Sequence, residues 1–144
     1  MKSCTIAWIE DEIDILKPLV KPLQQRGIRI NEYMTYSQAI DHMDEISRCD
    51  LILLDLIIPP GKAKGLEDEE NLGKKFLEEF RKTHGDKMPV IILSVFGESE
   101  EDGLNQQERN DLHVHCLAKR IRPSKLMEEV LAKLGLPLIE KTGD

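Results

Sequence analysis

The segment that decides the fold is "DLILLDLIIPP", residues 50–60, an apolar run that holds an aspartate, Asp55, at its centre. Apart from Asp50 and Asp55, every residue before the first proline is leucine or isoleucine. Such a continuous run predicts a strand over residues 50–55, in a parallel sheet that is covered on both faces. Burying a carboxylate there is costly unless the group is paired, binds a cation or lies at the end of the strand. Asp55 is therefore a candidate functional residue.

Similar short apolar runs recur along the chain, and each is followed by a longer amphipathic stretch. We expect strands over residues 4–9, 28–33, 50–55, 88–94 and 113–119. We expect helices over residues 13–27, 37–47, 67–83, 98–111 and 123–135. Pro18 and Pro22 fall inside the first helix, which should kink or start near Pro18, and Ser37 is a candidate N-cap of the second. Five alternating units predict an α/β fold with a parallel sheet between two layers of helices and right-handed crossovers.

The composition narrows the class of protein. The 144 residues suffice for one domain with its own core, and 40% hydrophobic with 33% charged residues indicate a soluble globular protein. A net charge of −7 argues against binding of the nucleic acid backbone. No apolar run is long enough to span a bilayer, and nothing resembles a signal peptide. Cys4, Cys49 and Cys116 are widely spaced, which favours reduced thiols in the cytoplasm over a disulfide or a zinc site.

Polar residues follow four of the five predicted strands. They are Glu10 and Asp11 after the first strand, Asp55 after the third, Ser94 at the end of the fourth and Lys119 at the end of the fifth. In open parallel sheets, ligands bind beyond the carboxyl ends of the strands, so these side chains should converge. Converging carboxylates repel each other unless a cation neutralises them, and hard oxygen ligands suit Mg²⁺ or Mn²⁺. A hydroxyl and an ammonium opposite them would complete a site for an anionic phosphoryl group.

These motifs resemble the receiver domain of two-component response regulators, of the chemotaxis-regulator type. The resemblance rests on "IEDE" after the first strand, "LILLDLIIPP" around Asp55, "VIILSVFG" around Ser94 and "CLAKRIRP" around Lys119. It implies a single flavodoxin-like, doubly wound sheet of five parallel strands in the order 2-1-3-4-5. The receiver domain would cover residues 3–134, and residues 135–144 would form a short tail.

The resemblance also implies a role for each residue of the motifs. Asp55 would be the phosphoacceptor, taking a phosphoryl group from a histidine kinase or a phosphotransfer protein. The ligands of Mg²⁺ or Mn²⁺ would be Asp11, Asp55, the backbone carbonyl of Ile57 and, through water, Glu10. Lys119 would pair with the phosphoryl oxygens, and the Ser94 hydroxyl would move to bond them. The protein would be a signalling switch that phosphorylates itself, rather than a turnover enzyme, and would act on a downstream protein target.

Each residue also has a simpler interpretation without a functional role. Asp55 could cap the following loop, and Glu10 and Asp11 could stabilise the first turn of a helix through its dipole. Ser94 could merely end a strand, and Lys119 could be a solvated charge in a basic run. Four motifs in the right order on five units favour the functional interpretation.

Four features depart from the usual receiver pattern. Arg120 follows Lys119 where the family has proline, which should alter the approach of the lysine. Cys116 replaces the aromatic switch residue, so the usual coupling should be weakened, and the branched Val95 should narrow access to the phosphoryl group. Residues 59–73 are longer than the usual loop and form either a lid or partner surface beside the site, or a solvated insertion.

Other functions compete with a phosphorylated receiver. A pseudo-receiver would bind proteins without phosphorylation; the changes around Lys119 favour it and the intact acids oppose it. A phosphatase of the haloacid dehalogenase type needs a second acid two residues after the nucleophile, where this chain has Ile57. His113 and His115 would share one face of the fifth strand, but without a third ligand they do not predict a metal site. We expect Trp8 in the core, no contact with nucleic acid or membrane, and leave a homodimer open.

Overall fold

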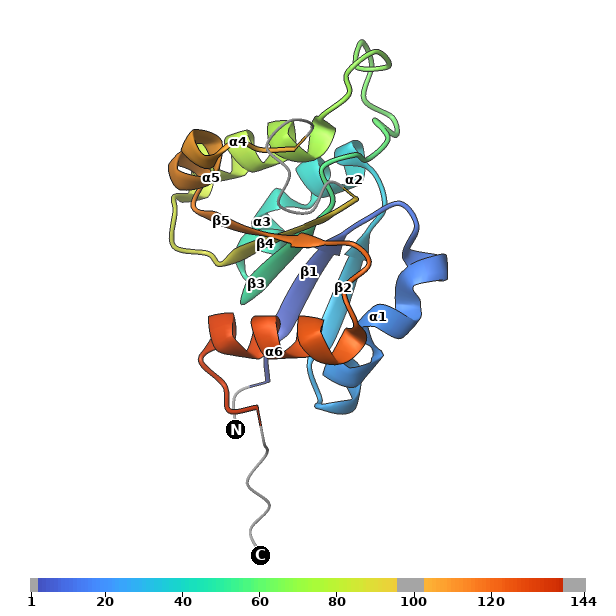
Figure 1. Cartoon of the computed structure of the whole chain (residues 1–144). Coiled ribbons are helices and arrows are strands. Elements are labelled where there is room, and N and C mark those ends of the chain that lie inside the picture. Colours follow the sequence, from blue (N-terminus) through green and yellow to red (C-terminus); the bar gives the residue numbers. More distant parts are fainter. Residues whose placement is uncertain (1–2, 96–102, 139–144) are drawn as a thin grey trace, which may run out of the picture.

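The computed structural model describes residues 3–95 and 103–138, and this part of the chain contains a sheet of five parallel strands (Figure 1). The strands are β1 (Thr5–Ile9), β2 (Arg29–Tyr33), β3 (Leu51–Leu54), β4 (Val90–Ser94) and β5 (Val114–Ala118). Their order is β2-β1-β3-β4-β5, which confirms the flavodoxin-like topology. From β1 the chain continues to β2 on one side of it, and then to β3 on its other side. In folds of this class, a crevice opens at the carboxyl edge where the strand order changes direction in this way.

Helices cover both faces of the sheet. Those in the described ranges are α1 (Ile13–Gln25), α2 (Tyr36–Asp41), α3 (Met43–Ser47), α4 (Leu72–His84), α5 (Gln106–Leu112) and α6 (Pro123–Leu134). α1 and α6 pack together on one face, and α2 to α5 lie on the other (Figure 1). None of these helices combines the length and the apolar character that crossing a bilayer requires.

The alternation of side chains along each strand divides the core into two apolar clusters. In β1, Ala7 and Ile9 belong to the cluster under α2 to α5, whereas Ile6 and Trp8 belong to the cluster under α1 and α6. β3 contributes buried residues to both clusters, which explains why its sequence is apolar throughout. Trp8 is a core residue, as expected.

The segment predicted as one helix over residues 37–47 forms two helices, and its N-cap differs from the prediction. Thr35 caps α2, because its hydroxyl accepts a hydrogen bond of 3.1 Å from the Gln38 N–H. The Ser37 hydroxyl instead accepts a hydrogen bond of 2.9 Å from the Lys62 N–H. Serine and threonine are both good caps, so only the contact with the distant loop distinguishes their roles.

Other helix limits also differ from the prediction. α4 begins at Leu72, five residues after the predicted start of its helix at residue 67. α1 starts at Ile13 and includes Pro18 and Pro22, so a start near Pro18 was wrong. Each proline removes one backbone hydrogen bond, and the burial of an apolar stripe on α1 offsets this loss. The stripe consists of Ile13, Leu19, Val20 and Leu23. Of the helix predicted over residues 98–111, the structure describes α5 from Gln106 onward, and residues 96–102 lie outside the described ranges.

The register of the sheet brings the ends of several strands to one edge. Ile9 pairs with Leu54 across β1 and β3, and the Asp55 N–H donates a hydrogen bond of 3.0 Å to the Ile9 carbonyl. Across β4 and β5, the Lys119 N–H donates to the Ser94 carbonyl at 2.9 Å. The backbone ladder therefore fixes the residues that follow each strand at the same carboxyl edge.

Candidate functional site

Three carboxylates converge at the carboxyl edge of the sheet. Glu10 and Asp11 directly follow β1, and Asp55 follows the neighbouring strand β3. One carboxylate oxygen from each residue lies within 4.8 Å of the others. Glu10 is 0% exposed and Asp55 is 4% exposed, whereas Asp11 is more accessible. The structure thus brings together the three acids that the strand ends predicted, two of them removed from water.

Lys119, which follows β5, reaches across to two of these acids. Its ammonium nitrogen Nζ lies 2.9 Å from Asp55 Oδ2. The same nitrogen lies 3.0 Å from Glu10 Oε1 and 3.2 Å from Glu10 Oε2. Lys119 makes these contacts with Arg120, not proline, after it. A single ammonium therefore bridges the two buried carboxylates.

The remaining oxygens of these carboxylates are only partly satisfied. Asp55 Oδ1 accepts a hydrogen bond of 3.2 Å from the Ile57 N–H, and Glu10 Oε2 accepts one of 3.1 Å from the Glu12 N–H. Among the described residues, no donor forms a directed hydrogen bond with buried Glu10 Oε1, although Lys119 Nζ lies close to it. Three carboxylates beside one ammonium leave an excess of negative charge. This donor set fits a hard divalent cation such as Mg²⁺.

The electrostatic surroundings shift the pKa of each buried group. Burial, followed by the charge of Asp55, raises the pKa of Glu10 to about 7. Burial also raises the pKa of Asp55, although its hydrogen bond with Lys119 opposes this shift. For Lys119, burial alone would lower the pKa, but the hydrogen bonds with Asp55 and Glu10 outweigh it and the pKa is raised. Binding of a cation or a proton by these buried carboxylates is therefore favoured.

Ser94 ends β4, beside β3, with its side chain buried. Val95, the next residue along the chain, is exposed. Cys116 is buried in the cluster under α2 to α5, at the position on β5 that pairs with Ile92. The sulfhydryl occupies much less space than an aromatic ring, so β5 has no bulky side chain at this position.

Gly73, in the first turn of α4, is a site residue that the sequence analysis missed. Its N–H donates a hydrogen bond of 2.9 Å to the Leu56 carbonyl. A Cβ atom on Gly73 would lie 2.2 Å from the Asp55 carbonyl oxygen and 2.6 Å from the Leu56 Cα, so no side chain fits there. A glycine inside a predicted helix could have signalled this close approach of two backbones. α4 therefore packs directly on the backbone that carries Asp55.

The long segment after β3 is attached to α2 at its start. The N–H groups of Tyr36 and Ser37 donate to the carbonyls of Pro59 and Pro60 at 2.8 and 3.2 Å. At Gly61, which has a φ of +68°, a Cβ atom would lie 2.4 Å from the Ser37 hydroxyl oxygen. Beyond this attachment the loop projects from the domain before it reaches α4 (Figure 1). Its start is docked on α2 rather than placed over Asp55.

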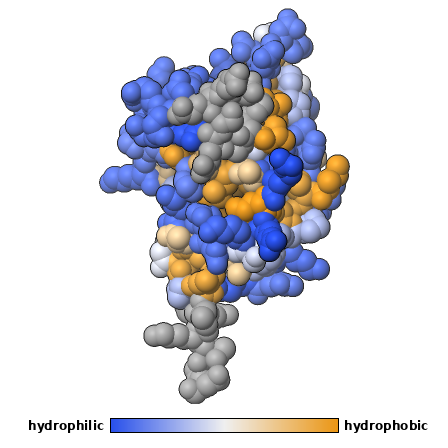
Figure 2. Space-filling view, in the orientation of Figure 1, coloured by the Kyte–Doolittle hydropathy of each residue, from blue (hydrophilic) through white to orange (hydrophobic). Residues whose placement is uncertain are grey.

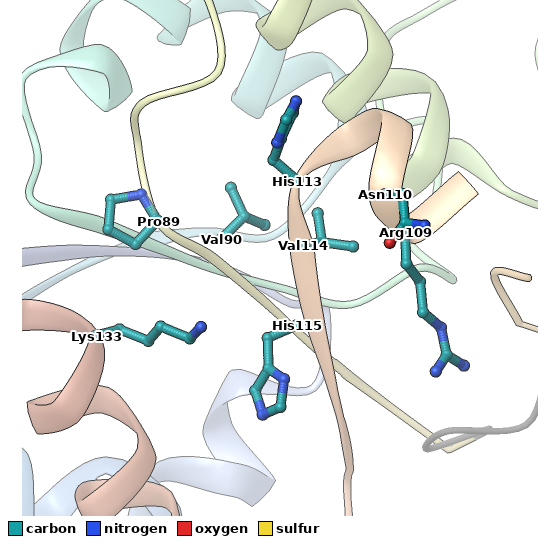
Figure 3. A pocket seen from close by; sticks show the side chains of 8 residues that line it. All are labelled: Pro89, Val90, Arg109, Asn110, His113, Val114, His115 and Lys133. Atoms are coloured by element: carbon teal, nitrogen blue, oxygen red, sulfur yellow. The ribbon is translucent and has the colours of Figure 1, made fainter. Parts of the chain in front are cut away.

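A groove of about 290 Å³ lies at the opposite, amino-terminal edge of the sheet (Figure 3). Its walls come from α5, the starts of β4 and β5, and the end of α6. The lining residues are Pro89, Val90, Arg109, Asn110, His113, Val114, His115 and Lys133. His113 precedes β5 as the C-cap of α5, with a left-handed φ of 55°.

The two histidines of this groove do not form a pair. Their rings point to opposite sides (Figure 3). His113 Nε2 lies 3.5 Å from Asp86 Oδ2, and His115 Nε2 lies 3.4 Å from Glu129 Oε2. The expectation that both share one face of a strand was wrong, because the left-handed turn at His113 rotates its side chain away.

Comparison with known proteins identifies the family. A model of the response regulator receiver domain matches residues 6–131. Part of a sensor kinase, CckA of Brucella abortus, is 30% identical over 97 residues, which make up 67% of this chain and 9% of the kinase. The chain therefore spans about a tenth of the length of that relative.

Solved structures with the same fold share less sequence. A CheY-like receiver domain protein from Methanospirillum hungatei has a TM-score of 0.71 and 20% identity, over 93% of this chain and 95% of that one. The receiver domain of a Francisella response regulator has a TM-score of 0.70 and 19% identity, over 92% and 98%. The signal receiver domain of a LuxO repressor protein from Vibrio parahaemolyticus has a TM-score of 0.66 and 20% identity, over 93% and 92%.

Proposed function

Because the chain belongs to the response regulator receiver family, which its match over residues 6–131 shows, we propose that it is a phosphorelay switch with Asp55 as the phosphoacceptor. The observation that supports this most is the ammonium of Lys119, 2.9 Å from a buried Asp55 carboxylate beside two further acids. Asp55 thus has the positive charge of Lys119 beside it, and together with Glu10 and Asp11 it offers oxygen ligands for a cation. The receiver domain is proposed to cover residues 3–134, with residues 135–144 as a tail.

The divalent ion, Mg²⁺ or Mn²⁺, would be held by four groups of this chain. They are Glu10 through water, Asp11, Asp55 and the backbone carbonyl of Ile57. When bound, the cation supplies positive charge next to the phosphoryl oxygens. The three carboxylates, whose oxygens lie within 4.8 Å of one another beside a single ammonium, support this proposal.

In the proposed reaction, a carboxylate oxygen of Asp55 attacks the phosphorus of a phosphohistidine on the donor protein. The new P–O bond forms as the P–N bond breaks, and the imidazole nitrogen of the donor keeps the electron pair. The Ile57 N–H holds one carboxylate oxygen in place at 3.2 Å. Lys119 would turn from the carboxylates to the transferred phosphoryl oxygens, and the Ser94 hydroxyl would donate to one of them.

The surface around the site supports docking of a phosphodonor protein. Ile15, in the first turns of α1, is 75% exposed, and Val95 and Ile57 are 70% and 42% exposed. All three lie beside the carboxyl edge of the sheet that holds Asp55. Figure 2 shows apolar surface at the start of α1 and over β5, next to hydrophilic side chains. A histidine kinase or a phosphotransfer protein would cover these side chains while it presents its phosphohistidine.

Intact mass spectrometry tests the phosphoacceptor. Incubation with Mg²⁺ and acetyl phosphate or phosphoramidate should add one phosphoryl group to the wild type and none to Asp55→Asn, since an amide is a poor nucleophile. Asp14→Asn, which changes an exposed acid of α1, serves as the matched control and should be labelled. Labelling of Asp55→Asn would place the acceptor elsewhere. An unlabelled wild type that still binds Mg²⁺ would favour a pseudo-receiver that acts as a protein-binding module.

A further inference from the structure

α5 is held to the rest of the domain by polar contacts with α4 and by one partly buried apolar side chain, Leu112, which packs against the core at its end. None of its seven residues, Gln106–Leu112, is buried. Its neighbour α4 lies beside it (Figure 1). At the start of α5, Lys74 forms an ion pair with Glu108, and at its end Arg81 donates hydrogen bonds to two carbonyls. Leu104, just before the helix, is the nearest buried apolar anchor.

The two contacts with α4 differ in strength. Arg81 is buried, and its guanidinium donates to the carbonyls of Leu112 at 2.8 Å, His113 at 3.0 Å and Gly85 at 3.3 Å. Moving the end of α5 would remove the Leu112 and His113 carbonyls from this buried charge and leave it only the Gly85 carbonyl, at the C-cap of α4. The side chains of Lys74 and Glu108 are 30% and 27% exposed, so water can replace their contact. The start of α5 is therefore easier to move than its end.

The weaker contact is also the one next to the acidic site. Lys74 directly follows Gly73, whose backbone packs on the Asp55 carbonyl and donates to the Leu56 carbonyl at 2.9 Å. Because no side chain separates the two backbones, a shift of the Asp55 backbone would displace Gly73 directly. Glu108, the partner of Lys74, also belongs to the capping box of α5, where its carboxylate accepts from the Asn105 N–H at 3.0 Å.

We propose that the ion pair between Lys74 and Glu108 is the relay that couples the state of Asp55 to α5. The relay rests on the proposed function, since phosphorylation is the event that it transmits. Phosphorylation and cation binding would reposition the backbone at Asp55, Gly73 would shift the first turn of α4, and Lys74 would pull or release the start of α5. This path does not require an aromatic side chain at position 116, where β5 has a cysteine.

The relay changes a surface far from the acidic site. Arg109 and Asn110 of α5 form one wall of the groove at the amino-terminal edge of the sheet, opposite Lys133 of α6 (Figure 3). A rotation of α5 about the fixed Arg81 end would move this wall relative to β5. The state of Asp55 would thereby change the shape of this groove.

The chain offers variants that separate the ion pair from the cap. Lys74→Met removes the charge and keeps the apolar stem. Glu108→Gln removes the ion pair, whereas its side-chain oxygen can still accept from the Asn105 N–H, as glutamine does in capping boxes. Lys75→Met, on the exposed side of the same turn of α4, is the matched control.

Backbone amide chemical shifts measured with Mg²⁺, before and after addition of beryllofluoride as a phosphoryl mimic, test the relay. In the wild type and in Lys75→Met, we expect shifts at residues 55–57 and at residues 105–112. In Lys74→Met and Glu108→Gln, the shifts at residues 55–57 should persist, and those at residues 105–112 should fall at least about twofold. Unchanged shifts at residues 105–112 in both variants, or none there in the wild type, would overturn the relay. A failure of the proposed function is distinct, because residues 55–57 would then not respond in any protein.

Discussion

The unusual pKa of Glu10 makes the stability of the domain depend on pH in a defined direction. Burial and the neighbouring Asp55 raise this pKa from 4.5 to about 7 in the folded state. Between these values the folded protein holds a proton that the unfolded chain has released. Stability from this group is therefore present at low pH and is lost as the pH rises toward about 7. At about 1.4 kcal/mol per pKa unit, the loss amounts to about 2 to 3 kcal/mol between pH 5 and 8.

Urea unfolding followed by circular dichroism, with a chelator present, measures this loss. The free energy of unfolding of Glu10→Gln should fall less between pH 5 and pH 8 than that of the wild type, by about 2 to 3 kcal/mol. Glu12→Gln, which changes the nearby exposed carboxylate, should retain the pH dependence of the wild type.

Mg²⁺ provides a second arm of this experiment. A cation bound to the deprotonated carboxylates should restore most of the lost stability at pH 8, and have less effect at pH 5, where Glu10 is protonated. The same pH dependence in Glu10→Gln as in the wild type would show that Glu10 titrates normally. The inference that burial at this site raises the pKa of Glu10 would then be wrong.

Three further variants test separate parts of the account. Mg²⁺ should quench or shift the fluorescence of Trp8, and Asp11→Asn should weaken this binding at least about tenfold; an unchanged titration would remove the metal site. Gly73→Ala should destabilise the fold by about 1 to 2 kcal/mol in urea unfolding, because the clash with the Asp55 backbone exceeds the gain in helix propensity. Lys75→Ala, its control on the same helix, should be near neutral. Arg81→Met should cost about 2 kcal/mol by leaving carbonyls unpaired, and equal stability to the wild type would show that the Arg81 contacts are dispensable.

Much of the fold follows from local sequence. Alternating apolar and amphipathic segments predict strands and helices, because each segment must present an apolar face to one core. The acids at the ends of β1 and β3 could be assigned to one edge for the same reason: parallel strands of a sheet all end on one side. The strand order came from the resemblance of the motifs to the receiver family, and the structure confirms it.

Helix ends and the contacts of single side chains depended on the tertiary structure. Thr35 and Ser37 are equally good caps by residue type, and a hydrogen bond from the distant Lys62 separates them. The separation of His113 from His115 depends on the left-handed C-cap of α5, which the alternation of a strand does not predict.

The chemistry of the site shows the same division. The ionisable residues that follow the strands can be read from the sequence, since their assignment depends on the apolar period and on position along the chain. In contrast, the bridge that Lys119 forms between Glu10 and Asp55, and the rise of the Glu10 pKa to about 7 through burial, depend on the folded chain. The close approach of Gly73 to the Asp55 backbone also depends on the folded chain. These properties arise from distances and desolvation between segments far apart in the chain, and local sequence patterns carry no information about either.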